Sequence, residues 1–292
     1  MEGIGSLLKT VSPEQSAFPY EQKSPKERLQ ERVDDYNALA GNLDQEDGYN
    51  CDICKNKGHI SIVVEGAMEG YYVESQLWCR CNRVRNALRR LNRSGLESVV
   101  KRYTFDRYQT LDTWQEIIKQ NAMKFCKDDK HNWFFIGGQS GAGKSHICTA
   151  ITVHYIKQGL DARYMLWQEE IDKLKAVAMD AEQFEPLMKE LKEVPVLYID
   201  DLFKEGEGSK VKETQFSQAD VKRTFEIINY RSMNPELVTI ISSEKTIEAM
   251  VEIDQALAGR IAELANKDEC GYCIALAPDI KKNWRLKGMV TL

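Results

Sequence analysis

The segment from residue 133 to residue 158 constrains the fold more than any other part of the chain. The apolar run WFFIG, residues 133–137, precedes the loop GGQSGAGKSH, and the loop leads into ICTAITVHYIKQ, which has the composition of a helix. This order of strand, loop and helix is the context in which the pattern G-x-x-x-x-G-K-[ST] forms a phosphate-binding loop. The pattern here runs from Gly138 to Ser145, so the segment predicts such a loop at the end of a strand.

Four further apolar runs of strand length lie beyond about Tyr103. They are ARYMLW (162–167), VLYID (196–200), VTIIS (238–242) and YCIAL (272–276). Segments of helical length separate the runs, and this alternation is typical of a parallel sheet covered by helices on both faces. The sequence therefore predicts the α/β class for this part of the chain.

The loop contains the residue types that bind the phosphates of a nucleotide. Its glycines let backbone N–H groups turn inward, and the positive end of the following helix adds to their effect. Lys144 is expected to reach the β- and γ-phosphates, and Ser145 to place its hydroxyl on Mg²⁺. A glycine-rich turn of an ordinary α/β loop is the alternative, and the complete motif argues against it. The residues expected to contact ATP are Gly138, Gly141, Ala142, Gly143, Lys144, Ser145 and His146.

Two adjacent acids supply the other half of this site. Asp200 and Asp201 follow the apolar run that begins at Val196. A buried strand carries Asp200 to the carboxyl edge of the sheet, beside the phosphate loop, where it is expected to hold the metal through water. Asp201 is then placed to orient or deprotonate the attacking water. Such a pair is often only part of a turn, but its place downstream of the phosphate loop favours catalysis.

The cysteines nearest the N-terminus form two close pairs, C-x-x-C and C-x-C. These are Cys51, Cys54, Cys79 and Cys81. Four thiolates suffice for tetrahedral Zn²⁺, and the metal would supply folding energy to a segment with little apolar material of its own. His59 is an alternative ligand. Cys270 and Cys273 form another C-x-x-C, but the second lies in a predicted buried strand, so packing is the preferred interpretation.

Net charge and hydropathy exclude several classes of protein. A formal charge of −5 argues against a protein that coats nucleic acid over its whole surface. No apolar run approaches the roughly 20 residues that span a bilayer, and the N-terminus lacks the pattern of a signal peptide. We therefore expect a cytoplasmic protein without a membrane partner, in a reducing compartment where clustered thiols usually bind metal.

One stretch departs from the acidic average. Residues 80–102 contain eight cationic side chains and the single acid Glu97, and the stripe of Val84, Leu88 and Leu91 predicts a helix that also packs. A solvated basic face and a contact with DNA phosphates or an acidic partner both remain open. The cations are Arg80, Arg83, Arg85, Arg89, Arg90, Arg93, Lys101 and Arg102.

The first 48 residues are polar and predict one helix, from about Lys26 to Leu43. Ser24 and Pro25 suit an N-cap followed by the first helical position. The helix has a modest apolar face, which must dock on something. Docking on the rest of this chain and docking on a partner protein are equally open.

Taken together, the motifs resemble those of AAA+ helicase loaders of the DnaC and DnaI type. The similar pieces cover residues 95–265, in the family's order, and the cysteine region resembles that family's N-terminal zinc domain. The resemblance implies a protein that binds the hexameric replicative helicase through its N-terminal domain. It also implies an ATP-controlled oligomer that places the helicase on single-stranded DNA. The pieces are SGLESVVKRYTFDRYQT, GGQSGAGKSH, VLYIDDLFK, FEIINYRS, TIISSEKT and LAGRIAEL.

The resemblance also implies roles for single residues. Arg260 is similar to the arginine finger, which reaches the γ-phosphate of a neighbouring subunit. Glu244 stands where the family often has Asn in its sensor segment, so Ser243 is the expected substitute. Residues 168–192 correspond to an extra helical element of initiators and loaders, although simple core packing is equally plausible. The chain ends soon after the last strand, so we expect no separate helical lid domain.

We expect three regions: an N-terminal helical segment (1–50), a zinc-binding region with the basic helix (51–100) and an AAA+ ATPase domain (101–292). Two alternatives to a helicase loader remain. One is an ATP-dependent transposition regulator of the IstB type, which shares this ATPase core. The other is a zinc adaptor whose ATPase domain binds nucleotide only as a switch.

Overall fold

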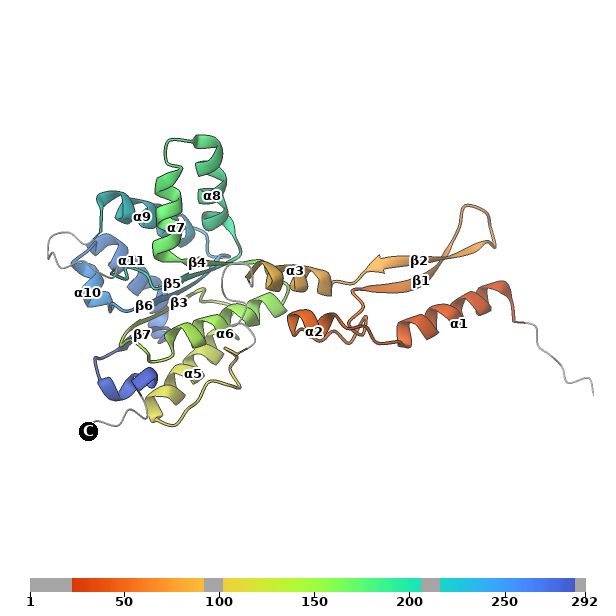
Figure 1. Ribbon diagram of the computed structural model, residues 1–292, viewed down its shortest axis with the longest axis horizontal. Coiled ribbons are helices and arrows are strands. Elements are labelled where there is room, and N and C mark those ends of the chain that lie inside the picture. The colour runs from red at the N-terminus through yellow and green to blue at the C-terminus, as the bar shows by residue number, and fades with distance from the viewer. Residues whose placement is uncertain (1–22, 92–101, 206–215, 287–292) are drawn as a thin grey trace, which may run out of the picture. The chain divides into compact units, whose positions relative to one another are not determined.

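The computed structural model describes residues 23–91, 102–205 and 216–286 (Figure 1). The chain divides into two compact units. The first is Met1–Gly41 with Asp52–Cys79, and the second is Asn42–Cys51 with Arg80–Leu292. None of the helices in the described ranges is both long enough and apolar enough to cross a membrane.

In the first unit, helix α1 (Pro25–Ala38) packs on an antiparallel hairpin of β1 (His59–Glu65) and β2 (Tyr72–Trp78). Ser24 caps α1 in a capping box with Glu27, and Pro25 is its first residue, as predicted. The docking is largely polar. The amide of Asn37 donates to the Ser61 carbonyl (2.8 Å) and accepts from the Ser61 N–H (3.0 Å). The helix therefore docks on its own chain, which was one of the two open interpretations.

Helix α1 ends at Ala38, earlier than the predicted end near Leu43. Lys55 Nζ donates to the Ala38 carbonyl at 3.1 Å, and Lys57 Nζ donates to the Leu39 carbonyl, so two lysines satisfy the last carbonyls of the helix. Gly41 then passes so close to the backbone of Asn56 that a Cβ there would overlap its carbonyl. This contact requires the chain to leave the helical path after α1. The last residues of the predicted helix therefore connect α1 to the short helix α2 (Leu43–Asp47).

The second unit contains a parallel five-stranded sheet in the order β4-β5-β6-β3-β7. Each strand forms from one of the five predicted apolar runs, with bounds that differ by at most one residue. Trp167 begins the helix after β4, Tyr272 precedes β7, and β3 and β6 each extend one residue further than predicted. The predicted α/β class with a helix-flanked parallel sheet is confirmed. The strands are β3 (Trp133–Gly138), β4 (Ala162–Leu166), β5 (Val196–Asp200), β6 (Val238–Ser243) and β7 (Cys273–Leu276).

Helices cover both faces of this sheet (Figure 1). Alternate residues of β3 point into separate cores: Phe134 and Ile136 into one, Trp133 and Phe135 into the other. The first core lies under α3 (Cys81–Leu91), α5 (Thr113–Phe125) and α6 (Lys144–Lys157). The second lies under α7 (Trp167–Ala176), α8 (Ala181–Glu193), α9 (Gln218–Ser232), α10 (Ile247–Val251) and α11 (Gln255–Ala265).

The extra element predicted at residues 168–192 consists of α7 and α8. Its apolar residues Ile171, Leu174 and Leu191 are buried in the second core, whereas Ala178 is exposed. Core packing therefore accounts for most of the apolar residues of this element.

Parallel pairing brings the functional ends of three strands to one edge. In the register, Gly137 of β3 lies opposite Ser243 of β6, and Ile199 of β5 lies opposite Ile241 of β6. The phosphate loop after β3 and the two aspartates at the end of β5 are thus separated by a single strand. The turn after β6 comes between them.

A buried arginine ties the second core together. Arg231, at the end of α9, is fully buried and donates to the Thr239 hydroxyl at 2.9 Å and the Val238 carbonyl at 2.6 Å. Its Nη1 also donates to the carbonyls of Leu191, Lys192 and Val194, where α8 ends. One guanidinium thus satisfies carbonyls that the end of a helix leaves unpaired.

We predict that Arg231→Ala destabilises the protein by about 2–5 kcal/mol, because the buried carbonyls lose their donors. Urea unfolding measures the loss. Lys222→Ala, at an exposed position of the same helix, is the control, and its effect should stay within about 0.5 kcal/mol. Equal effects of the two substitutions would contradict this role of Arg231.

Candidate functional site

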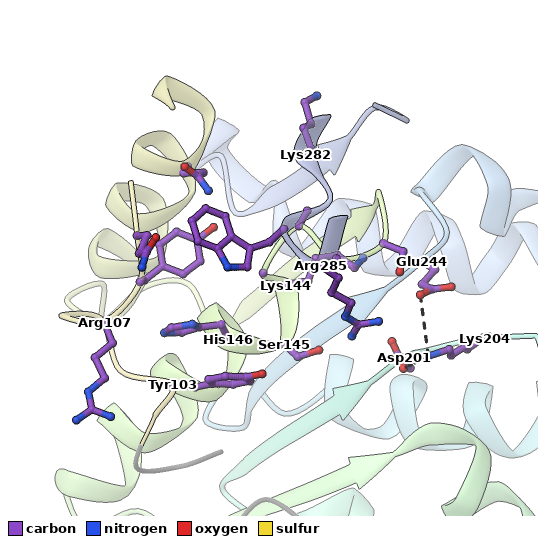
Figure 2. A pocket seen from close by; sticks show the side chains of 18 residues that line it. Tyr103, Arg107, Lys144, Ser145, His146, Asp201, Lys204, Glu244, Lys282 and Arg285 are labelled. Atoms are coloured by element: carbon purple, nitrogen blue, oxygen red, sulfur yellow. Dashed lines mark hydrogen bonds and ion pairs between the residues drawn. The ribbon is translucent and has the colours of Figure 1, made fainter. Parts of the chain in front are cut away.

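A cavity of about 380 Å³ opens at the carboxyl edge of the sheet, over the predicted phosphate loop (Figure 2). Five cationic side chains and two carboxylates line it, so its charge favours an anionic ligand. The charged residues are Arg107, Lys144, Lys204, Lys282, Arg285, Asp201 and Glu244.

The loop takes its shape from three glycines with positive φ. Gly138, Gly141 and Gly143 have φ angles of 103°, 71° and 85°, which disfavour other residues. A Cβ on Gly138 would overlap the Leu276 carbonyl of β7, so the loop also depends on close backbone approach. Helix α6 begins directly after Gly143, and its N-terminus therefore points its free N–H groups into the loop.

Lys144 is folded back onto the loop. Its Nζ donates to the carbonyls of Gly138 and Gln139, both at 2.8 Å. Burial lowers the pKa of this ammonium, and the carboxylates of Glu244 and Asp201 oppose the shift. A bound polyphosphate would offer this cation acceptors of opposite charge, which it lacks within the loop.

Asp200 is buried at the end of β5 and accepts hydrogen bonds from three hydroxyl groups. Ser145 Oγ lies 3.1 Å from Asp200 Oδ1, Tyr164 OH lies 3.0 Å from Oδ2, and the Ser242 hydroxyl also donates to Oδ1. Burial and the neighbouring Asp200 carboxylate raise the pKa of the Tyr164 phenol, which therefore remains a donor. Ser145 and Asp200 form an adjacent pair of hard oxygen donors, which suits Mg²⁺.

The next residue, Asp201, adopts the left-handed conformation, with φ of 55°. Its carboxylate lines the cavity and accepts a hydrogen bond from Lys204 Nζ at 2.7 Å. The two adjacent aspartates therefore face different surroundings: one is enclosed by hydroxyl groups and the other is open to the cavity.

The two residues considered for the sensor differ in position. Ser243 is buried, donates to the Leu202 carbonyl at 2.6 Å and is absent from the cavity lining. Glu244 lines the cavity instead. Among the described residues, Glu244 therefore has access to a ligand in the cavity, whereas Ser243 does not.

Arg260, the predicted finger, lies on α11 and does not line the cavity of its own chain. Its guanidinium carbon lies 5.2 Å from the centre of the Phe225 ring. An arginine that acts on a neighbouring subunit must lie away from its own site, so this location is compatible with the predicted role.

A cluster of rings at one end of the cavity was not predicted from the sequence. His146 stacks on Tyr103 with centroids 4.6 Å apart, and Tyr108 meets it edge to face at 5.2 Å. His146 Nε2 also bonds to the Thr104 carbonyl at 2.9 Å, and burial lowers the pKa of its imidazole. The aromatic residues of YTFDRYQT were the available signal, but no spacing related them to the loop.

The segment after β7 also contributes to the cavity, through Lys282, Trp284 and Arg285. The Trp284 N–H donates to the Gly141 carbonyl at 2.9 Å, which ties this segment to the phosphate loop. Figure 2 shows the Arg285 guanidinium directed toward Ser145 and Asp201. The only sequence signal was the cationic run KKNWR, which has no periodicity.

The arginines of the basic stretch have different environments. Arg83 is exposed, whereas Arg85 is fully buried and pairs with Asp47 at 2.6 Å. Arg89 pairs with Glu46 at 3.1 Å. The stretch therefore combines a solvated face with a buried structural arginine, and its end from residue 92 to residue 101 lies outside the described residues.

The four N-terminal cysteines lie together. Their Sγ atoms are all within 4.8 Å of one another, and all four residues are buried. Tetrahedral Zn²⁺ with Zn–S bonds of about 2.3 Å requires Sγ atoms roughly 4 Å apart, so the set fits this ion. The Gly58 N–H donates to Cys54 Sγ at 3.2 Å, and Arg85 bonds to Cys81; both contacts favour thiolates.

The other candidate ligands lie outside this cluster. His59 bonds to the Tyr36 hydroxyl instead. Cys270 packs in the first core of the sheet, whereas Cys273 packs against the second. The two thiols of this C-x-x-C thus belong to opposite faces, which agrees with a packing role.

A protein-family model described as IstB-like ATP binding protein matches residues 66–262. The uncharacterized protein YqaM of Bacillus subtilis is 30% identical over 196 residues, which make up 64% of this chain and 60% of YqaM. The chain thus spans less than two thirds of that relative. The phage-like element PBSX protein XkdC of Bacillus subtilis is 28% identical over 227 residues, covering 75% of this chain and 80% of XkdC.

Similar solved structures include DnaI, at 16% identity, a TM-score of 0.45 and coverage of 63% of this chain and 92% of DnaI. The DnaC helicase loader has 24% identity and a TM-score of 0.44, with coverage of 61% and 99%. The family match includes the phosphate loop and both aspartates, and it confirms the predicted ATP-binding domain.

We predict that Arg285→Ala weakens ATP binding about 10- to 100-fold, because a cation facing the phosphates is lost. Lys144→Ala should reduce binding at least as much. Titration with a fluorescent ATP analogue measures both effects. Lys281→Ala removes an exposed charge four residues earlier, outside the cavity, and should leave the affinity unchanged. A similar loss in the Lys281 variant would indicate only a general effect of net charge.

Proposed function

The chain belongs to the family of IstB-like ATP-binding proteins, and we propose that it is an ATP-hydrolysing helicase loader. In this proposal it binds a hexameric replicative helicase and delivers it to single-stranded DNA when replication begins. The observation that carries the enzymatic part is the cavity, where the phosphate loop meets the Ser145–Asp200 pair and the open carboxylate of Asp201. The loader function rests on the motif resemblance and on the cysteine cluster upstream of the ATPase.

The polar residues at the phosphate loop have separate roles in the proposed reaction. Lys144 exchanges the loop carbonyls for the β- and γ-phosphate oxygens, and Arg285 contacts the same anion from the segment after β7. Ser145 and Asp200 hold Mg²⁺, which neutralises phosphate charge when it is bound. Asp201 orients the attacking water. The ring cluster at His146 closes the opposite end of the cavity, where the base would lie.

The location of Arg260 supports self-assembly. Because this arginine lies outside its own cavity, it could act as an arginine finger only on the γ-phosphate of a neighbouring subunit. We therefore propose that the active form is an oligomer in which each subunit completes the site of the next.

We predict that Asp201→Asn and Arg260→Ala each bind ATP but lose turnover by about 10³-fold or more. Because one defect lies in the cavity and the other acts across subunits, a mixture of the two variants contains some intact sites. Mixing should restore part of the activity in a phosphate-release assay. Mixtures as inactive as either variant alone would exclude catalysis in trans.

The cysteine cluster gives the N-terminal part its role in the proposal. We assign Zn²⁺ to Cys51, Cys54, Cys79 and Cys81. Residues 1–50 and 51–100 then form the module that carries the helicase contact, and residues 101–292 carry the ATPase. The first unit exposes large apolar side chains, which supports a protein partner. They include Trp78 (83% exposed), Met68 (69%), Leu39 (64%) and Tyr71 (55%).

In this proposal, local cationic side chains contact the single-stranded DNA. Arg83 is exposed on the basic helix and is one candidate. The sequence also offers loop lysines as candidates: Lys204 bonds to Asp201 in the cavity, and Lys210 and Lys212 lie outside the described residues. Binding through such local cations would be weak and sensitive to salt.

Two alternative functions differ from a loader in what they bind or in turnover. The description of the matched family favours a transposition regulator of the IstB type. Affinity purification distinguishes this function from a loader, because a loader retains a hexameric helicase and a regulator retains a transposase. A zinc adaptor that uses ATP only as a switch would bind nucleotide without turnover.

We predict that Cys79→Ser removes bound zinc and abolishes helicase capture, because metal supplies the folding energy of the segment that it holds. ATP affinity should change less than about twofold, because two cores of its own stabilise the ATPase sheet. Zinc content, pull-down and ATP titration test this. Cys273→Ser, outside the cluster, should retain metal and partner. Point substitution is preferable to truncation near Lys101, because Val84 and Leu88 of α3 pack in the core beneath the ATPase sheet. A Cys79 variant that keeps its metal and its partner would contradict the assignment.

A further inference from the structure

The turns after β5 and β6 face each other with complementary charges. Lys204 and Glu205 follow β5, whereas Glu244 and Lys245 follow β6. Lys204 Nζ lies 4.0 Å from Glu244 Oε1, and Lys245 Nζ lies 2.7 Å from Glu205 Oε1. Of the two lysines, only Lys204 lines the cavity, where it also bonds to Asp201 at 2.7 Å. Figure 2 shows the ammonium of Lys204 between the two carboxylates.

The backbone beneath Lys204 is held in place. Asp201 and Phe203 both have φ of 55°, an uncommon conformation for residues other than glycine. The Leu202 N–H donates to the Ser242 carbonyl at 2.9 Å, and the Lys204 N–H donates to the Asp201 carbonyl at 3.0 Å. Phe203 is buried, with its ring 5.0 Å from that of Trp167. The tight turn of residues 201–204 therefore places the Lys204 side chain next to the Asp201 carboxylate.

The ion pair between Lys204 and Asp201 lies among several carboxylates. Asp200, Asp201 and Glu244 all act on the Lys144 ammonium, so three carboxylates lie near the place of the phosphates. An unrestrained carboxylate next to a polyphosphate would turn away from it. Lys204 holds one oxygen of Asp201 by a charge-assisted hydrogen bond, and the other oxygen remains available to a water molecule in the cavity.

We propose that Lys204 is a positioning residue for ATP hydrolysis, and that Glu244 holds the ammonium of Lys204 in place. This inference rests on the proposed ATPase activity. In the reaction, the water oxygen bonds to the γ-phosphorus as the bond from phosphorus to the β,γ-bridging oxygen breaks. ADP leaves with that electron pair, and the water proton passes to Asp201 or to the phosphate. Lys204 acts only through Asp201, by fixing the orientation of the carboxylate that binds the water.

The test separates positioning from phosphate binding. We expect Lys204→Ala to lower kcat about 10- to 100-fold and to change KM and Kd for ATP less than about threefold, because the ground-state complex does not depend on the orientation of Asp201. Lys204→Arg should recover most of kcat. Glu244→Gln should lower kcat by a smaller factor, about two- to fivefold, because its contact with Lys204 is longer.

Lys245→Ala is the matched control, because it breaks the neighbouring ion pair outside the cavity, and its kcat should remain within about twofold of the wild type. In an Asp201→Asn background, Lys204→Ala should have no further effect, since the two residues act as one unit.

Three results would overturn the inference while leaving the proposed ATPase intact: an unchanged kcat in Lys204→Ala, a loss of ATP affinity that matches the loss of kcat, or additive effects with Asp201→Asn. The second result would make Lys204 a phosphate ligand. A wild-type protein without turnover, even with single-stranded DNA and helicase present, would overturn the proposed activity and this inference together.

Discussion

The close packing of the phosphate loop against its neighbours is the constraint on which the rest of the site depends. Gly138 lies against the Leu276 carbonyl of β7, and Gly141 lies against Asn283. A Cβ at Gly138 would overlap that carbonyl, a Cβ at Gly141 would displace the Asn283 side chain, and both positions have φ angles that suit glycine. Because the loop is held this closely, Lys144 and Ser145 start α6 in a defined direction. The segment with Trp284 and Arg285 is brought over the cavity by the same contacts.

The second requirement of the site is a balance of charge. Carboxylates at the ends of β5 and β6 attract Mg²⁺ but repel the phosphates of the same ligand. The two adjacent aspartates have different partners. Asp200 is enclosed by the hydroxyl groups of Ser145, Tyr164 and Ser242, whereas Asp201 bonds to a lysine. These different surroundings support the proposed roles of Asp200 as a metal ligand and of Asp201 as the residue that orients water.

The N-terminal cysteines and the buried charged side chains near them also require a balance of charge. Four thiolates around the proposed Zn²⁺ would carry net negative charge, which burial makes unfavourable unless donors surround the sulfur atoms. Arg85 supplies one such donor to Cys81 and also pairs with Asp47. An arginine that would otherwise belong to a basic surface thus stabilises the interior. Arg231 has the same function at the end of α8, where it is bound almost entirely by backbone carbonyls.

The sequence by itself determined the features that depend on local order along the chain. The five strands followed from apolar runs, the start of α1 from Ser24 and Pro25, and the phosphate loop from glycine spacing. Tertiary structure decided where α1 ends, that Arg85 is buried, and that Glu244 rather than Ser243 faces the cavity. It also brought Tyr103, Arg285 and Lys204 to the site. These outcomes depend on contacts between residues far apart in the chain, and such contacts leave no periodic pattern in the sequence because each is made once, by a single side chain.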